Sequence, residues 1–487
     1  MEGIDAAVDA VVAPAAALLS RIVFFEIPVA DVGVPLVVLW LVAAGVFFTV
    51  YLRGIALWGF PVALRLLRGR PATPRGGEVS GAVSGEVTHF QALSTAVSGT
   101  VGIGNIGGVA VAIGAGGPGA AFWLFLAGVL GMATKFAECT LGVRHRRVHG
   151  DGRVSGGPMH YLEHGLAGRG RARLGRGLGI FYAVGIVVGC MGIGNMFQAN
   201  QAFVQLVGVT GGEASFFAGR GWLFGLVMAA LVGSAILGGI RTIARVTQVL
   251  VPFMAVLYLG TAFTVLALNG AALPWAVGEI VRAAFTGEAA AGGALGALVV
   301  GFQRAVFSNE AGIGSASIAH SAVRTDRPAS EGFVGLLEPF IDTVVICMTT
   351  ALVIVTTSRL APGFDAGLDG IAMTSAAFAR VVPFFPPLLA LAAILFGLST
   401  MLAWSYYGLK GFTYLTGPSR GAEAGFKAVF CAFIVLGSMI ELGSVLDFSD
   451  AMVFLICVPN IVGLYLLAPE VREELRRFRS PAAGGQS

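Results

Sequence analysis

The sequence predicts an all-α polytopic membrane protein, and three observations support this. Only 12% of its 487 residues are charged, while 56% are hydrophobic and the mean hydropathy is +0.84. A soluble domain is about one quarter charged, so charge this sparse cannot cover a soluble globule. A bilayer span needs about 20 mostly apolar residues. The chain offers about eleven such stretches, at 33–52, 88–115, 119–143, 178–207, 221–239, 243–268, 292–320, 331–357, 386–412, 424–442 and 448–468.

The first 87 residues are expected to lie outside the main helical core. Residues 1–32 begin with the acidic run MEGIDAAVDA, which lacks the basic start of a signal peptide. We expect them to form an N-terminal extracellular or interfacial segment, with an amphipathic helix over 5–28. Residues 33–87 are expected to form an extra transmembrane helix followed by a basic cytoplasmic loop.

The distribution of Lys and Arg predicts the orientation, because short cytoplasmic loops are enriched in these residues. If the N-terminus lies outside, the inner segments carry 24 of the 31 basic residues and the outer segments carry five. We therefore expect a multi-pass protein of the cell membrane with its N-terminus outside. The C-terminal residues 469–487, which include VREELRRFRS, are then a cytoplasmic tail.

Several other classes of protein are not supported by the sequence. The five cysteines form no CxxC pair and the six histidines form no HExxH motif, so neither a metal centre nor a metalloprotease is indicated. The net charge of +4 reflects the loop bias, and no basic face points to nucleic acid. The long inner loops at 53–87 and 144–177 are too short to bury a core. We expect one membrane domain and no enzyme activity.

Two similar segments of the sequence predict an internal structural repeat. HFQALSTAVSGTVGIGN at 89–105 and GFQRAVFSNEAGIGS at 301–315 each combine Phe-Gln, a polar stretch and Gly-Ile-Gly, five helices apart. Two five-helix units of opposite orientation, each starting with a glycine-interrupted helix, are typical of inverted-repeat transporters. The predicted transport core is 88–468, with repeats at 88–268 and 292–468. Chance is the alternative, because glycine is abundant and MGIGNMFQ at 191–198 is a third copy.

The two glycine-interrupted segments are the first candidates for a binding site. Glycine costs about 1 kcal/mol in a helix interior relative to alanine. A broken helix inside a membrane is tolerated where it lines a protein-enclosed cavity. The freed amides suit a carboxylate, and the freed carbonyls suit Na⁺ or an ammonium group. Segments 98–105 and 307–314 therefore suit a zwitterionic amino acid. Close helix packing through Gly104 and Gly108 is the alternative for the first segment.

Three polar side chains in other spans are weaker candidates. The adjacent hydroxyls of Ser399 and Thr400 suit a hard cation, although such hydroxyls more often bond to their own helical turn. Gln198 could bond a substrate or a neighbouring helix.

Charged residues within membrane spans are candidates for functional residues, because burying a charge in a bilayer is unfavourable. Lys135 and Glu138 are spaced to neutralise each other. Glu338 and Asp342 lie one helical turn apart. Glu310 lies in the second interrupted segment, where it could be a proton site, a gate or an acceptor for the exposed amides. We favour the last role.

Long stretches of the chain resemble the sodium:alanine symporter family of alanine or glycine:cation symporters. The resemblance covers about 85–470, and its strongest blocks are FQALSTAVSGTVGIGNIGGVA, GGPGAAFWLFLAGVLGMATKFAEC and FSNEAGIGSASIAHSA. It implies cation-coupled uptake of alanine or glycine. It also implies a 5+5 inverted-repeat core of the leucine-transporter type, with the helix at 33–52 as the additional one.

The resemblance also implies individual site residues. VGIGN at 101–105 is similar to an unwound helix whose Asn ligates Na⁺ beside the substrate carboxylate. FGLST at 396–400 is similar to a helix whose paired hydroxyls complete a second Na⁺ site. The implied cation ligands are Ser98, Val101, Asn105, Phe396, Ser399 and Thr400. The implied substrate contacts are Thr100, Gly102, Gly104, Asn105, Gln198, Phe307 and Trp404. At the position of Gly99, transporters of the wider fold commonly have a larger polar residue. The resemblance therefore leaves the ligands of the first Na⁺ site open.

The expected function is amino-acid transport driven by ion transport. Na⁺ is the expected co-transported ion, alanine or glycine the substrate, and the lipid bilayer the surroundings, with the oligomeric state left open. One alternative is an H⁺-coupled symporter, acting through Glu310, or an exchanger. Another is an amino-acid sensor that does not transport, although the 19-residue tail leaves little room for signalling.

Overall fold

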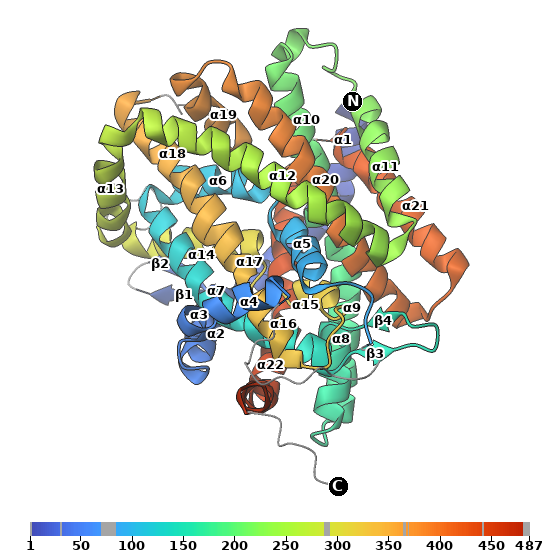
Figure 1. The fold of residues 1–487 in the computed structure, drawn as a ribbon. Helices are drawn as coiled ribbons and strands as arrows, with labels where there is room; N and C mark the ends of the chain where they lie inside the picture. Colours follow the sequence, from blue (N-terminus) through green and yellow to red (C-terminus); the bar gives the residue numbers. More distant parts are fainter. Residues whose placement is uncertain are drawn as a thin grey trace.

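The structure is a computed structural model that describes residues 2–29, 32–69, 84–286, 293–363, 367–368, 370–440 and 443–480. Helices make up most of it (Figure 1). The helices of the first half are α1 Glu2–Val23, α2 Leu36–Tyr51, α3 Ile55–Trp58, α4 Phe60–Leu67, α5 His89–Thr100, η1 Ile103–Asn105, α6 Gly107–Gly116, α7 Gly119–Arg144, α8 Pro158–His160, η2 Tyr161–Gly165, α9 Ala172–Met191, η3 Gly192–Met196, α10 Phe197–Val209, η4 Gly212–Ala214, α11 Gly221–Ile236 and α12 Gly239–Leu268.

The second half is built in the same way. Its helices are η5 Gly270–Ala272, α13 Leu273–Phe285, α14 Gly293–Asn309, α15 Ala316–His320, α16 Pro328–Gly335, α17 Leu337–Pro339, η6 Phe340–Cys347, α18 Met348–Leu360, α19 Gly370–Val381, α20 Phe385–Thr416, α21 Arg420–Gly437 and α22 Gly443–Arg479. The strands form two small antiparallel pairs, β1 Glu26–Val29 with β2 Val32–Pro35, and β3 Arg147–Val148 with β4 Val154–Ser155.

The all-α, multi-pass class is confirmed. Among the described residues, six helices are long and apolar enough to cross a membrane, or eight if each of two bent pairs counts as one span. Every predicted apolar stretch overlaps at least one helix. The count of eleven spans, the inverted repeat and the domain boundaries stay predictions.

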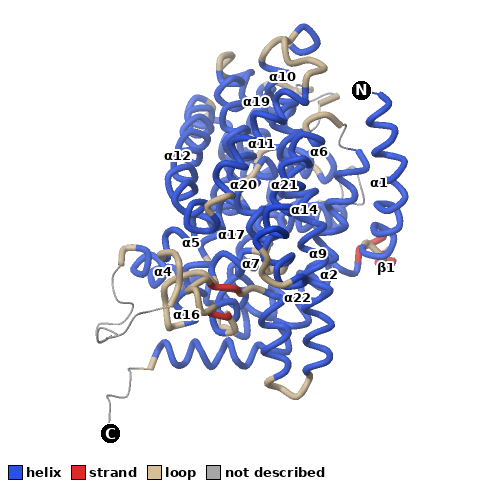
Figure 2. Tube along the Cα trace, turned by 90° about the vertical axis from the view of Figure 1, so that its right-hand side faces the viewer, coloured by secondary structure: helices blue, strands red, loops and turns tan. Residues whose placement is uncertain are grey.

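The N-terminal segment differs from the helix expected over 5–28. Helix α1 ends at Val23, and the chain then forms the β1–β2 hairpin, in which Glu26 pairs with Pro35. A helix through residue 28 is therefore wrong, because those residues pair with a strand instead. Helix α1 packs along α22, and Figure 2 shows it at the side of the molecule.

Two helices lie where the sequence analysis predicted only loops. Helix α13 and helix α19 are short, so neither offers an apolar stretch of spanning length. Helix α19 packs on α6, and the Thr374 hydroxyl donates to the Ile106 carbonyl at 2.9 Å. It therefore lies directly beside the first interrupted helix.

The last helix continues beyond the predicted end of its span. Helix α22 extends to Arg479 without interruption, and its last turns run across the bottom of Figure 2. Arg144 at the end of α7 holds these turns through ion pairs with Glu470 at 2.9 Å and with Glu474. The helical part of the predicted tail is thus attached to the core, and its residues 481–487 lie outside the described part.

Helices α7 and α20 form the centre against which the interrupted helices pack. Helix α7 contacts α2, α14 and α16, and α20 contacts α5, α9, α10 and α12. Close approach is essential where α14 crosses α7, since a Cβ built at Gly301 would lie 2.5 Å from the Ala120 carbonyl oxygen. This packing places both interrupted helices inside protein, where freed backbone groups find partners.

Candidate functional site

The first predicted break is present between α5 and α6. The two helices are bent by 62° at this point, with the short helix η1 between them. The break frees backbone amides, and two of them are bonded by side-chain oxygens. The Gly102 N–H donates to Asn105 Oδ1 at 2.9 Å, and the Ile103 N–H donates to Gln198 Oε1 at 3.1 Å. These are amides that an anionic group could take over.

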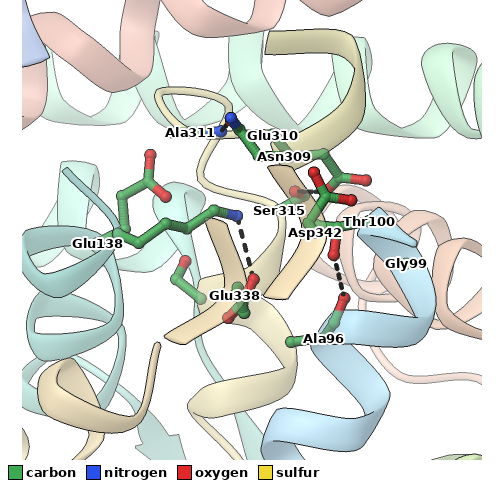
Figure 3. A network of polar contacts seen from close by, with 12 residues as sticks. Ala96, Gly99, Thr100, Glu138, Asn309, Glu310, Ala311, Ser315, Glu338 and Asp342 are labelled. Carbon is green, nitrogen blue, oxygen red and sulfur yellow. Dashed lines mark hydrogen bonds and ion pairs between the residues drawn. The ribbon is translucent and has the colours of Figure 1, made fainter. Parts of the chain in front are cut away.

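The second predicted break lies between α14 and α15. Helix α14 ends at Asn309, and the next residues include Glu310, Gly312 and Gly314, all with positive φ. A non-glycine residue with positive φ is strained and is often found at functional sites. Figure 3 shows Glu310 and Ser315 on this segment, with Glu138 on a facing helix.

Two amides of the second break, those of Ala311 and Gly312, have partners other than Glu310. The Ala311 N–H donates to Asn309 Oδ1 and the Gly312 N–H donates to Glu138 Oε1, both at 2.9 Å. The expectation that Glu310 caps these amides is therefore wrong. The Glu310 carboxylate instead accepts from Trp404 Nε1 at 3.0 Å and from the Ser315 hydroxyl. It joins the second break to α20.

Most of the predicted cation ligands on α5 and α20 lie together. The Ser98 carbonyl accepts from Thr400 Oγ1 at 3.0 Å and lies 3.5 Å from Ser399 Oγ. The Ser399 hydroxyl also donates to the Phe396 carbonyl at 2.9 Å. Carbonyl and hydroxyl oxygens of this kind suit a hard cation. Among the described contacts, no hydrogen bond connects the Val101 carbonyl to this group.

Asn105 belongs to a second polar group, centred on Asp342. Asn105 Nδ2 donates to Asp342 Oδ1 at 2.5 Å, and Asp342 Oδ2 accepts from Ser308 Oγ at 2.8 Å and from Thr343 Oγ1 at 2.7 Å. Asp342 is fully buried. Its carboxylate therefore connects η1, α14 and η6. The sequence pointed to Asp342 and to segment 307–314, which contains Ser308, but it gave no signal that Ser308 and Thr343 bond to Asp342.

The predicted substrate residues gather around the first break, with one exception. A Cβ built at Gly104 would lie 3.4 Å from the Phe307 ring. Phe307 packs edge-on against Phe197, with 5.3 Å between the two ring centroids. The fully buried Trp404 donates from Nε1 to the Gly99 carbonyl at 3.3 Å. The exception is Thr100.

The Thr100 hydroxyl bonds back into its own helix. It lies 3.3 Å from the Val97 carbonyl and 3.5 Å from the Ala96 carbonyl, and Figure 3 shows the contact with Ala96. The structure therefore does not bring this hydroxyl to the other predicted substrate contacts. A hydroxyl in a membrane helix commonly bonds in this way.

Gly102 has the tightest position in the site. A Cβ built on it would lie 2.7 Å from Thr400 Oγ1 and 3.1 Å from Gln198 Oε1. The backbone of the break thus touches both the cation group on α20 and the polar side chain on α10. Gln198 Nε2 is held by the Ile193 carbonyl at 3.2 Å, which fixes the amide in this orientation.

The buried charges are paired differently from the prediction. Lys135 Nζ lies 3.3 Å from Glu338 Oε2, so its partner is Glu338 and not Glu138. Glu138 is one helical turn away but turns toward the second break, where Asn460 Nδ2 also donates to it at 2.9 Å. The i,i+3 spacing allowed the expected pair, and the tertiary packing decided against it.

Comparison with known proteins agrees with this geometry. The family model described as "Sodium:alanine symporter family" matches residues 24–487. The sodium/alanine symporter AgcS of Methanococcus maripaludis is 37% identical over 446 residues, which is 91% of this chain and 94% of that protein. The probable sodium/glutamine symporter GlnT of Bacillus subtilis is 32% identical over 93% of this chain and 89% of its own length.

A solved structure supports the fold independently. The crystal structure of MhsT in complex with L-phenylalanine matches with a TM-score of 0.53 and 17% sequence identity. The match covers 82% of this chain and 99% of that one, which places the chain in the leucine-transporter class of folds. The two glycine breaks, the buried polar groups around them, and the family match over 24–487 lead to one conclusion: this chain belongs to the sodium:alanine symporter family, whose members are cation-coupled amino-acid transporters and not enzymes.

Proposed function

We propose that this protein couples Na⁺ influx to the uptake of alanine or glycine by alternating access. The observation that carries the proposal is the closeness of Gly102 to both Thr400 and Gln198, since a Cβ built there would lie 2.7 Å from Thr400 Oγ1 and 3.1 Å from Gln198 Oε1. At this point a backbone suited to an amino-acid carboxylate touches a hydroxyl suited to Na⁺. Binding of either ligand therefore changes the surroundings of the other.

The first Na⁺ position is proposed between α5 and α20. Its ligands are the Ser98 and Phe396 carbonyls and the Ser399 and Thr400 hydroxyls, with the Val101 carbonyl joining when the ion binds. The Thr400 hydroxyl now donates to Ser98. It would have to rotate so that both oxygens face the ion. Na⁺ would then hold α5 against α20.

A second Na⁺ position is proposed at Asn105, beside the substrate. Asn105 Oδ1 is the expected ligand, and the buried Asp342 carboxylate supplies the negative charge that a desolvated cation needs. Ser308 and Thr343 orient that carboxylate.

The substrate is proposed to bind across the two breaks. Its carboxylate replaces the side-chain oxygens now bonded to the Gly102 and Ile103 amides, and its ammonium group meets carbonyls of the second break together with Gln198. Thr100 belongs to this proposed set through its backbone. Phe307 and Trp404 are large rings beside Gly104 and Gly99. They leave room for a hydrogen or a methyl side chain, which favours glycine and alanine.

The test is uptake of radiolabelled alanine into proteoliposomes of the purified protein. We expect uptake to require an inward Na⁺ gradient, and unlabelled alanine and glycine to compete better than glutamine. Uptake that is indifferent to Na⁺, to H⁺ and to membrane potential would overturn the proposal. Glu310→Gln distinguishes the H⁺-coupled alternative, because Na⁺-driven uptake should survive that change. Binding of alanine without any uptake would favour a sensor.

The proposed orientation has the N-terminus outside and the C-terminus in the cytoplasm of the cell. The charge distribution of the loops supports it. Labelling of single cysteines introduced at exposed ends of the helices, from outside intact cells, is the direct measurement.

A further inference from the structure

A row of acidic and basic side chains leads from the start of α5 into the centre of the molecule. Its members are His89, Glu331, His320, Glu338 and Lys135, which we call the acid–base chain. His89 Nδ1 contacts Glu331, Glu331 Oε1 lies 2.6 Å from His320 Nδ1, and His320 Nε2 lies 2.5 Å from Glu338 Oε1. The Glu338–Lys135 ion pair completes the row. The His89 side chain is 24% exposed, and the other four are fully buried.

The hydrogen bonds of His320 require an additional proton. Both of its ring nitrogens face carboxylate oxygens, but a neutral imidazole has one N–H and one lone pair. If His320 were neutral and both carboxylates ionised, one of the two contacts would set two lone pairs against each other. A second proton on the ring makes both contacts charge-assisted hydrogen bonds. The geometry at His320 is therefore that of a bound proton.

The charge balance of the buried residues leads to the same conclusion. With His320 protonated, the two positive charges of His320 and Lys135 match the two negative charges of Glu331 and Glu338. Without that proton the four fully buried members keep one net negative charge, and the other partner of Glu331, His89, is 24% exposed to solvent. Buried charge without compensation is strongly unfavourable.

Among the residues that the structure describes, no cation outside the acid–base chain forms an ion pair with Glu331 or Glu338. Helices α5, α7, α16 and α20 pack against α15. Besides the acid–base chain they present Glu138 and Cys139 of α7 and Tyr407 of α20, none of which is a cation. The guanidinium group of Arg146, in the loop after α7, donates hydrogen bonds to the backbone carbonyls of Ser321 and Thr325.

A metal ion is the competing occupant, because ligand atoms of Cys139, His320 and Glu338 lie within 4.8 Å of one another. Two observations favour the proton. A metal would have to replace the hydrogen bond between His320 and Glu338, and it would lie beside the Lys135 ammonium group. Both changes are unfavourable for a cation at this place.

We propose that His320 is a proton-binding site, filled through His89 from the face predicted to be cytoplasmic, and that transport requires its proton. The acid–base chain joins α5, α7, α15 and α16–α17. The proton passes from water to His89, then to Glu331, then to His320, where it stays. It is a resident proton and is not carried across the membrane with alanine. The protein would thereby sense cytoplasmic pH.

The first test measures transport, and so it also rests on the proposed function. Na⁺-driven alanine uptake is measured with equal pH on both sides of the membrane. The pH range is about 6 to about 9.5, and its lower end lies near the ordinary pKa of histidine. Wild-type uptake should fall as pH rises, by up to about tenfold per pH unit once the proton is lost. His320→Gln should give low uptake that no longer depends on pH in this range. Glu331→Gln, which removes one of the two carboxylates, should move the fall to lower pH.

The matched control is His149→Gln. His149 lies between β3 and β4, outside the acid–base chain, where it bonds to Ser155 at 3.0 Å. This variant should keep the wild-type pH profile.

The second test needs no transport and is therefore independent of the proposed function. The melting temperature of the purified protein in detergent should fall as pH rises, because loss of the proton leaves an unbalanced buried charge. The fall should be smaller in Glu331→Gln and unchanged in His149→Gln. Identical pH dependence of melting in wild type, His320→Gln and Glu331→Gln would overturn the proposal. So would one bound metal ion per chain that His320→Gln removes, or H⁺ influx that accompanies alanine and is lost in the same variant.

Discussion

At the scale of single residues, the site depends on positions where one atom more or less changes the contacts. Gly102 is the clearest case. Its missing side chain lets the first break touch both Thr400 and Gln198. Real Cβ atoms essentially never approach a non-bonded atom as closely as 2.7 Å, so any side chain here displaces one of these partners.

Gly102→Ala should therefore abolish most transport. We expect alanine to bind at least about tenfold more weakly, which corresponds to about 1.4 kcal/mol, because the methyl group pushes the break away from α20. The measurement is equilibrium binding of labelled alanine in saturating Na⁺. Gly108→Ala is the matched control in the same bent pair, since a Cβ there meets nothing within 4 Å. Equal loss in the two variants would contradict a specific role for Gly102.

Thr400→Ala tests the proposed cation group. A hydrogen bond or ligand contact to a charged group contributes about 1.5–3 kcal/mol. Loss of the hydroxyl should therefore raise the Na⁺ concentration for half-maximal uptake by about tenfold or more, and by more than the alanine concentration. The control is Thr416→Ala, which removes an exposed hydroxyl at the end of the same helix. A wild-type Na⁺ response in Thr400→Ala would remove Thr400 from the ion site.

At the scale of helices, the sequence was informative where glycine breaks a span and uninformative where partners come from far along the chain. The breaks at 98–105 and 307–314 could be predicted because glycine and polar residues are unfavourable in a lipid-facing helix. The partner of Lys135 could not. Glu338 is about 200 residues away, and only the packing of α7 on α16 and α17 brings it close.

Helix α19 shows a second limit. Its apolar residues are too few for a span, so composition alone assigns it to a loop. It packs on α6, and Thr374 donates to the Ile106 carbonyl beside the break. The Thr100 hydroxyl shows a similar limit, because spacing along a helix does not say whether a hydroxyl turns outward or bonds to its own turn.

A side chain of α22, Asn460, also bonds to the second break, and this leads to a stability prediction. Asn460 Nδ2 donates to Glu138 Oε1 at 2.9 Å and to the Gly312 carbonyl at 2.8 Å, and Asn460 Oδ1 accepts from the Tyr161 hydroxyl. Asn460→Leu keeps the approximate size but removes all three bonds, and Glu138 Oε1 then keeps only the Gly312 N–H as a described donor. We expect a loss of about 2–4 kcal/mol in the free energy of unfolding, measured by thermal melting in detergent.

The control for this prediction is Asn269→Leu. Asn269 follows the last turn of α12, and its side-chain nitrogen has no hydrogen-bond partner among the described residues. Its replacement strands no other group, so the melting temperature should change little. If Asn460→Leu melts like wild type, Asn460 does not fix the second break.

At the scale of the whole molecule, the two breaks are connected through their hydrogen bonds to α20. The first break is bonded to α10 through Gln198 and to α20 through the Ser98 carbonyl. The second break is bonded to α20 through Glu310 and Trp404. The helices that hold the two breaks therefore meet at the place where both ligands are proposed to bind.

This arrangement predicts that Na⁺ and alanine strengthen each other's binding by the same factor, because coupling free energy between two sites is reciprocal. Coupling of about 1–3 kcal/mol is typical, which is about a 5- to 150-fold change in affinity. The measurement is the dissociation constant of alanine in saturating Na⁺ and in K⁺, and the apparent dissociation constant of Na⁺ with and without alanine. In Gly102→Ala both factors should fall toward one together, since the contact between the two regions is lost, whereas Gly108→Ala should keep them. If alanine bound equally well in Na⁺ and in K⁺, or if Gly102→Ala kept the wild-type coupling factor, the proposed connection through Gly102 would be wrong.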